Sequence, residues 1–387
     1  MKFISYLENK ENIKMLKDAG VGELILGHQA FSRFGQLDDV ALYDFAQTCK
    51  EHDIRAIFEW DILLRENDLD EKCALISQMD LSSFAAIRVC DLGALKYCME
   101  HFPKHKIQLN LEMGHHNLAA IKKWCDFAGE RLDRVVLSIE IPRETLLSYV
   151  KALPVPVEIL ALGRIPLFYT PRKLLSWQCE TTSNNLLMAS GESEESPHKG
   201  FPILENAHGS FMFYIKDYSL LDFSDDFNDL EEKLSLRIDL RFGKDVSLIK
   251  EVVSILSSKN VDKQKIDIFK AHYPENLTRA FWAANRSDIL FSKLKNERID
   301  RTLTNYLGDI VHVVKGVHMV LLIKNPTLVL KTNDQLELKT PEGKSFLMNV
   351  FELHDSKGEV MNDVKEGQLV FLKHIKKITV RSAVYLL

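Results

Sequence analysis

Three short apolar segments alternate with two amphipathic helical segments in the middle of the chain, between Lys106 and Pro166. The apolar segments are rich in Val, Ile and Leu and end in polar or glycine-containing turns, which is typical of parallel strands buried on both faces. They are residues 107–112, 134–140 and 155–162, and the helical segments between them are 117–129 and 142–152. This βαβαβ order predicts a parallel sheet or a barrel.

The same alternation extends toward both ends of the chain. Further strands are predicted at 23–27, 54–60, 85–90 and 234–241, and further helices at 11–19, 41–52, 69–79, 92–101 and 246–256. Six strands in succession, each followed by a helix or a loop, favour a (β/α) barrel over an open doubly wound sheet. The first predicted strand is not followed by a GxGxxG motif, which argues against a dinucleotide-binding fold.

The pattern changes twice after Lys173. Residues 173–232 mix polar stretches with short apolar pieces, including a hairpin-like arm at 210–215, and predict an insertion packed over the barrel mouth. From 305 onward, short apolar runs separated by turn signals predict a small β-barrel. We therefore predict an α/β fold, a TIM-like (β/α) barrel over 1–304 with its insertion, and a C-terminal β-barrel over 305–387.

Composition narrows the class of protein. The 387 residues carry a formal charge of -5 with a pI near 6.2, which argues against a broad basic surface for nucleic acid and leaves room only for a local basic patch. The six cysteines are scattered without a CxxC pair, so neither a compact zinc site nor a disulfide framework is indicated. No apolar run approaches the length of a membrane span, and we expect a cytoplasmic protein without a membrane partner.

Polar residues at the carboxyl ends of barrel strands are the first candidates for a site, because active sites of this fold lie there. The predicted strands place eight such residues at that end: His28, Asp61, Asp91, Glu112, Glu140, Arg164, Asp239 and Arg241. Glu112 and Glu140 end consecutive strands, so they could form a general acid/base pair. The alternative is that each pairs with Arg164 or Arg241 in a structural ion network.

Histidines offer a weaker signal. His115 and His116 follow Glu112, but the spacing is not that of HExxH, and we expect them to cap a helix or face solvent. His198 and His208 lie in the polar insertion and are also expected to face solvent. We therefore predict no metal, although the sequence alone leaves open whether any of these four histidines binds one. The chain has no GxSxG nucleophile motif.

A group of cations and aromatic residues follows the sixth predicted strand. Arg164, Arg172 and Lys173 lie close in sequence to Phe168 and Tyr169. Such interleaving can bind a nucleobase or a phosphate. It can equally cover the barrel mouth, with the cationic side chains packing along the rings. Both interpretations stay open at this point.

The order of several motifs resembles peptidase family U32, the collagenase-like proteases, over nearly the whole chain. The resembling segments are 19–27, 87–95, 134–140, 158–164, 236–241, 278–281 and, in the C-terminal part, 308–311 and 338–343. The resemblance implies a peptidase or hydrolase. It also adds Arg279, in 278–281, to the candidate binding residues.

One departure from the family pattern bears on the cofactor. Family members with roles in RNA base hydroxylation or ubiquinone synthesis carry an iron–sulfur cluster on cysteines that begin just after the sixth strand. In this chain Pro166 and Lys173 stand where those thiolates would be, and Cys179 alone is nearby. One thiolate cannot hold a cluster that requires about four. We therefore predict no cofactor.

The resulting hypothesis is a U32-type hydrolase acting at the barrel mouth without a cluster. Its catalytic candidates are Glu112, Glu140 and Asp239, and its candidates for binding a peptide or RNA substrate are His28, Asp61, Arg164, Arg241 and Arg279. The alternative is a non-catalytic or accessory member that binds RNA or protein. A factor for RNA or quinone hydroxylation is disfavoured by the missing cysteines. The sequence gives no prediction of the oligomeric state.

Overall fold

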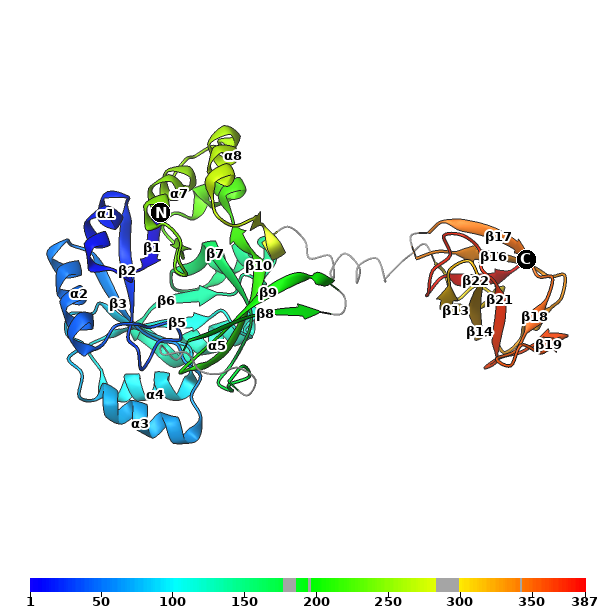
Figure 1. Cartoon of the computed structure of the whole chain (residues 1–387), viewed down its shortest axis with the longest axis horizontal. Helices are drawn as coiled ribbons and strands as arrows, with labels where there is room; N and C mark the ends of the chain where they lie inside the picture. The colour runs from blue at the N-terminus through cyan, green and yellow to red at the C-terminus, as the bar shows by residue number, and fades with distance from the viewer. Residues whose placement is uncertain (177–185, 194–195, 283–298, 342) are drawn as a thin grey trace. The chain divides into compact units, whose positions relative to one another are not determined.

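The chain forms two compact units, Met1–Ala283 and Ala284–Leu387. The computed structural model describes residues 1–176, 186–193, 196–282, 299–341 and 343–387 (Figure 1). Cys179 lies outside the described residues. In the described part, no helix is long and apolar enough to cross a membrane.

The first unit is a closed barrel of eight parallel strands, as predicted. Its strands are β1 (Lys2–Tyr6), β2 (Val21–Gly27), β3 (Arg55–Trp60), β4 (Ala86–Val89), β5 (Lys106–Leu111), β6 (Leu132–Leu137), β7 (Val157–Thr170) and β11 (Leu234–Ile238). The ring closes because β11 pairs with β7 on one side and with β1 on the other. β1 was not predicted from the pattern of the sequence, and it supplies the eighth strand.

Helices cover the outside of this barrel. They are α1 (Ile13–Asp18), α2 (Asp39–Glu51), α3 (Glu66–Ile76), α4 (Leu92–His101), α5 (Leu118–Ala128), α6 (Arg143–Ala152), α7 (Ile249–Leu256) and α8 (Lys263–His272). Outward-facing strand residues such as Leu24, Phe58 and Val135 pack into one apolar core with them. Asp91, one of the polar residues expected at the mouth, instead caps α4 by accepting hydrogen bonds from its first N–H groups.

The insertion continues the barrel wall. β7 is 14 residues long, and its second half pairs with β10 (Gly209–Ser219), which pairs with β9 (Ser196–Asn206) and then β8 (Leu187–Ser193). The green strands in Figure 1 show this antiparallel sheet leaving the barrel through β7. The first unit also contains the short strand β12 (Leu277–Thr278) and five 3-10 helices: η1 (Lys10–Asn12), η2 (Gly129–Arg131), η3 (Leu221–Leu230), η4 (Val246–Leu248) and η5 (Ala280–Trp282), counted over the described residues.

The second unit contains an eight-stranded antiparallel sheet around its own apolar core. In spatial order the strands are β17 (Ser345–Asn349), β16 (Gln335–Lys339), β22 (Ala383–Leu386), β13 (Tyr306–Val314), β14 (His318–Ile323), β21 (Leu369–Lys373), β18 (Leu353–His354) and β19 (Val360–Met361). A two-stranded sheet pairs β15 (Leu330–Lys331) with β20 (Asp363–Val364). The all-β character predicted for this part of the chain is present.

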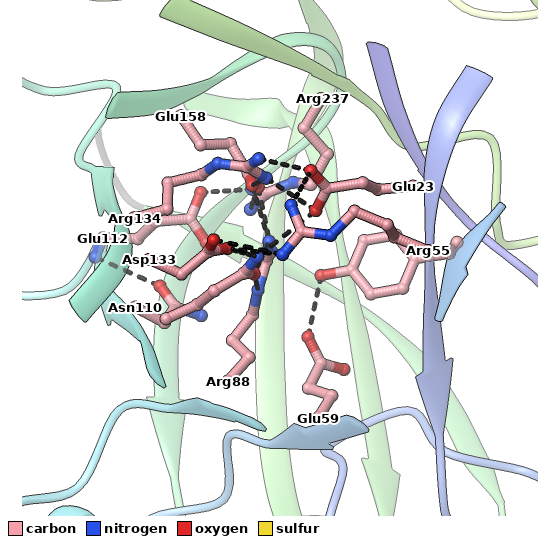
Figure 2. A network of polar contacts seen from close by, with 12 residues as sticks. Glu23, Arg55, Glu59, Arg88, Asn110, Glu112, Asp133, Arg134, Glu158 and Arg237 are labelled. Carbon is pink, nitrogen blue, oxygen red and sulfur yellow. Dashed lines mark hydrogen bonds and ion pairs between the residues drawn. The ribbon is translucent and has the colours of Figure 1, made fainter. Parts of the chain in front are cut away.

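Charged side chains fill much of the barrel interior. Figure 2 shows them converging from separate strands. Glu158 of β7 accepts hydrogen bonds from Arg88 (2.9 Å to Oε1), Arg237 (3.0 Å to Oε1) and Arg134 (3.3 Å to Oε2). The exposed fraction of the Glu158 side chain is 0%. Three guanidinium groups therefore share one buried carboxylate.

This network spans the barrel from one end to the other. Near the strand starts, Arg55 joins Glu23 (2.8 Å) and Asp133 (3.1 Å). Arg134 Nη1 also donates to Glu23 Oε2 at 3.0 Å, which connects this group to Glu158. At the opposite end, Arg237 bonds Glu112, which follows β5. Figure 2 shows the continuous run of contacts that links the barrel core to its mouth.

The pairing determines the charge state of the buried carboxylate. Burial alone would raise the pKa of Glu158, but Arg88, Arg237 and Arg134 lower it to about 2. Glu158 is therefore ionised in the folded protein at neutral pH. A carboxylate whose pKa is lower in the folded than in the unfolded state stabilises the fold above its unfolded pKa, and this stabilisation is lost as the pH falls through its folded pKa.

We predict that Glu158→Gln lowers the free energy of unfolding by about 3–5 kcal/mol at pH 7, because three buried arginines lose a shared counter-charge. The difference from the unmodified protein should shrink as the pH falls from about 4.5 toward 2. Urea unfolding across this pH range measures it. Glu144→Gln on α6, where Glu144 is exposed, is the control and should change stability by less than about 0.5 kcal/mol. A loss below about 1 kcal/mol at pH 7 would contradict the prediction.

Candidate functional site

A cavity of about 180 Å³ lies at the carboxyl ends of the barrel strands. Strand-end residues from both sides of the barrel line it, and Pro166, Leu167 and Phe213 from the extended β7 and β10 contribute to its wall. Five of the predicted site residues also line it: Glu112, Glu140, Arg164, Asp239 and Arg241. The structure therefore brings together all three predicted catalytic carboxylates and two of the predicted binding residues.

Asp239 and Arg241, which follow β11, form a bidentate ion pair. Arg241 Nε and Nη2 lie 2.9 and 2.7 Å from the two carboxylate oxygens of Asp239. Burial alone would raise the pKa of Asp239, but Arg241 lowers it to about 2. The Arg241 guanidinium also lies over the Tyr6 ring, with Cζ 3.2 Å from the ring centroid. Asp239 is thus held ionised and oriented.

A glycine makes room for this pair. Gly163 in β7 has a φ of +155°, and a Cβ atom at this position would lie 2.9 Å from the Cβ of Asp239 and 3.1 Å from its carbonyl oxygen. Real Cβ atoms essentially never show a contact as short as the first of these two distances, and the second is tighter than most. Any side chain at position 163 would therefore displace Asp239.

Glu112 and Glu140 have different partners. Glu112 pairs with Arg237, which also bonds Glu158. Glu140 follows β6, and its Oε2 lies 3.2 Å from Nε2 of His116. The exposed fraction of its side chain is 51%, against 17% for Glu112. The expected partners, Arg164 or Arg241, are therefore replaced by Arg237 for Glu112 and by His116 for Glu140.

Arg164 faces aromatic rings. Its Cζ lies 4.9 Å from the centroid of Phe242 and 5.5 Å from that of Phe213. No carboxylate among the described residues forms an ion pair with it. Phe242 has a φ of +69°, a conformation that non-glycine residues rarely adopt and that often occurs at functional sites. A partly exposed cation beside two rings, without a carboxylate partner among the described residues, is well suited to an anionic group.

Several lining residues were missed by the sequence analysis. Tyr6 belongs to the unpredicted strand β1, and its hydroxyl donates to Glu59 Oε1 at 3.1 Å. Ser32 also bonds Glu59, and burial and Asp61 raise the pKa of this carboxyl. Arg33 lines the cavity and is bound to Asp61. The sequence signal that could have revealed the charged interior is the presence of a charged or amide residue inside each of five mainly apolar strands: Glu23, Arg88, Gln108, Arg134 and Glu158.

The remaining predicted binding residues do not line the cavity. His28 is buried with Nε2 3.2 Å from Asp39. Asp61 accepts from Arg33 Nε at 2.6 Å, so it reaches the cavity only through that arginine. Arg279 is exposed between β12 and η5. Cys90, at the end of β4, donates its thiol to the Asp61 carbonyl (3.0 Å), and burial raises its pKa, so it is not a ready nucleophile.

The histidines of the sequence analysis lie in separate surroundings. His115 packs edge-on against Trp124, with ring centroids 5.2 Å apart, and His208 bonds the carbonyl of Gln29 at 2.7 Å. The side chain of His198 lies outside the described residues. In the part of the chain that the structure describes, no three His, Cys, Asp or Glu side chains form a group that could hold a metal ion.

The described residues do not fit an iron–sulfur cluster. Pro166 lies within β7 opposite Phe213 of β10, where the strand runs on without a thiolate. The described cysteines lie in or beside different elements: Cys49 in α2, Cys73 in α3, Cys90 after β4, Cys98 in α4 and Cys125 in α5. A cluster held by about four thiolates has no matching set of donors there.

The cations near Tyr169 are divided between two places. Arg164 lines the mouth cavity, whereas Arg172 and Lys173 line a second cavity that includes Arg65. Tyr169 is buried and stacks on Phe211, with ring centroids 4.6 Å apart. The five residues therefore do not form one cationic and aromatic cluster.

Comparisons with known proteins add a family and a fold. The family model described as "Peptidase family U32" matches residues 8–286. The C-terminal domain of a Geobacillus thermoleovorans putative U32 peptidase is similar to part of the chain, with 15% identity, coverage of 22% of this chain and 97% of that chain, and a TM-score of 0.20. The U32 peptidase Mk0906 is similar with 8% identity, coverage of 42% of this chain and 70% of that chain, and a TM-score of 0.33. A search of curated proteins finds no match.

We predict that Gly163→Ala lowers the free energy of unfolding by about 1–3 kcal/mol, because the new Cβ strains β7 and displaces Asp239. Urea unfolding at pH 7 measures the change. Gly22→Ala in β2 is the matched control, since a Cβ there meets nothing within 4 Å, and it should leave stability unchanged within about 0.5 kcal/mol. Equal stability of the two variants would show that the close approach at Asp239 is not a constraint.

Proposed function

The chain belongs to peptidase family U32, and we propose that it is a hydrolase of peptide bonds that acts at the mouth of its barrel without an iron–sulfur cluster. The proposal combines the family with the chemistry of the cavity. A cavity of about 180 Å³ lined by carboxylates and guanidinium groups suits a short polar segment of substrate.

The observation that carries the proposal is the unequal pairing of the three cavity carboxylates. Arg241 holds Asp239, whose pKa of about 2 makes it a weak base at neutral pH. Glu112 is engaged by Arg237. Glu140 alone of the three is paired with a histidine, His116, rather than with an arginine, and half of its side chain is exposed. We therefore assign the general base to Glu140.

The proposed reaction is a direct hydrolysis. Glu140 accepts a proton from a water molecule while the water oxygen attacks the carbonyl carbon of the peptide bond. The same proton passes from Glu140 to the leaving nitrogen as the C–N bond breaks, which restores the carboxylate. Arg164 stabilises negative charge on the substrate, either its terminal carboxylate or the oxyanion that forms during the attack. Asp239 orients Arg241, and Glu112 orients Arg237, so that both guanidinium groups line the cavity together with Arg164.

A role as an RNA or quinone hydroxylation factor receives less support. That role relies on a cluster in the family members that have it, and the described cysteines do not provide the donors. The alternative of a non-catalytic member that binds RNA or protein shares the cavity with our proposal. The two differ in whether Glu140 takes part in turnover.

We predict that Glu140→Gln lowers kcat for peptide hydrolysis at least about 100-fold, because the amide cannot accept the proton. A panel of short peptides with free or amidated carboxyl ends, followed by mass spectrometry, provides the assay. Glu144→Gln, four residues away on α6, is the matched control and should keep full activity. Arg164→Met should mainly raise KM for peptides with a free carboxyl end. Unchanged turnover in Glu140→Gln, with the fold intact, would reject Glu140 as the base, and absence of any cleavage by the unmodified protein would favour the non-catalytic alternative.

We also predict that the protein purified without oxygen contains far less than one iron per chain and shows no visible iron–sulfur absorbance, because it lacks a set of thiolate donors. Elemental analysis and an absorption spectrum measure this. Iron near about four atoms per chain would overturn the cluster-free proposal.

A further inference from the structure

The second unit carries a row of aromatic rings on the outer side of its antiparallel sheet. Along β14, Met319 and Leu321 belong to the apolar core, so the alternation of the strand turns His318, the residue before Met319, to the other side. Along β21 the same alternation turns Phe371 outward, because Val370 and Leu372 are in the core. The two outward residues therefore share one face.

Three rings on this face touch in sequence. The ring centroids of His312 and His318 are 6.0 Å apart, and those of His318 and Phe371 are 5.2 Å apart. His312 is exposed, and it reaches this face at an irregularity in the pairing of β13 with β14. No hydrogen bond engages the ring nitrogens of His312 or His318 among the described residues. The rings thus offer both stacking surfaces and free polar atoms.

Lysines gather at one end of this ring row. Lys315 lies in the turn between β13 and β14, and Lys373 is opposite His318 in the β14–β21 ladder. Lys376 and Lys377 follow within four residues. All four side chains are exposed, and none forms an ion pair with a described carboxylate. β18 pairs with β21, and Glu352, which precedes β18, pairs with His354.

The charge of the second unit differs from that of the whole chain. Residues 284–387 contain 16 Lys and Arg against 12 Asp and Glu, whereas the full sequence has a formal charge of -5. Such an asymmetry between parts of a chain favours a polyanionic partner for the basic part. The four lysines at the end of the ring row place positive charge next to the rings, where a polyanion would bind.

We propose that this ring face, formed by His312, His318 and Phe371 and flanked by Lys315, Lys373, Lys376 and Lys377, binds single-stranded RNA. Rings stack on unpaired bases, and lysines contact the phosphate backbone. The unengaged ring nitrogens of the two histidines can bond the ribose 2′-hydroxyl, which favours RNA over DNA. The proposal is independent of the mouth cavity, because none of its residues belongs to the first unit.

Fluorescence anisotropy tests the ring face on the full chain, with a fluorescein-labelled 12-nucleotide uridine RNA at about 50 and 200 mM salt. We expect binding that weakens as salt rises. Phe371→Ala should weaken binding at least about fivefold at both salt concentrations, because a stacking surface is lost. The double variant Lys373→Glu and Lys376→Glu should weaken it at least about tenfold at low salt and reduce its dependence on salt.

The matched control changes two exposed lysines elsewhere in the same unit, Lys331→Glu with Lys344→Glu, and should stay within about twofold of the unmodified protein. Thermal unfolding confirms that each variant is folded, and Glu140→Gln should bind RNA normally. Absence of binding at low salt, an equal loss in the control variant, or equal affinity for a 12-base-pair RNA duplex would overturn the proposal. A thymidine 12-mer DNA that binds as tightly as the RNA would overturn the assignment to RNA.

Discussion

The contact of three arginines with the buried carboxylate of Glu158 is the interaction on which the rest of the barrel depends. Taking these charges out of water costs free energy, and close pairing offsets that cost. Loss of Glu158 would leave Arg88 without a carboxylate partner among the described residues, whereas Arg134 and Arg237 would keep Glu23 and Glu112. The barrel is therefore held by matched charges where many barrels of this type stack branched apolar side chains. As a result, few residue types can replace those at the inward-facing positions of β4 to β7 and β11.

The same interaction sets the character of the mouth. Arg237 bonds Glu158 below and Glu112 above, so the position of Glu112 is tied to the core. Arg241 and Asp239 neutralise one another beside Tyr6. Charges that are already matched form the frame of the cavity, whereas Glu140 and Arg164 keep interactions that a ligand can replace. The cavity therefore has a fixed part, made of the paired charges, and an adaptable part, made of Glu140 and Arg164. Both parts consist of the same types of residue, carboxylates and arginines.

The sequence predicted the barrel because its strands are short, apolar and evenly spaced. It did not reveal β1, since Lys2–Tyr6 is a five-residue run whose role depends on pairing with β11, more than 200 residues away. The rule that polar residues at strand ends gather at one mouth correctly brought Glu112, Glu140 and Asp239 together. It could not assign partners: whether Glu112 meets Arg237 or Arg241 depends on strand register and side-chain direction. Arg33 and Phe34 come from a loop whose path no periodic pattern describes.

The continuity of β7 has a consequence for how molecules exchange with the cavity. One strand belongs to both the barrel wall and the sheet that lines the mouth, and it is hydrogen-bonded to neighbours along both halves. Many barrel enzymes admit ligands by swinging a flexible lid on the microsecond to millisecond scale. Here such a swing of β7 would break backbone hydrogen bonds of the wall itself. Passage past this side instead relies on rotation of individual side chains such as Leu167, a picosecond to nanosecond event at exposed positions.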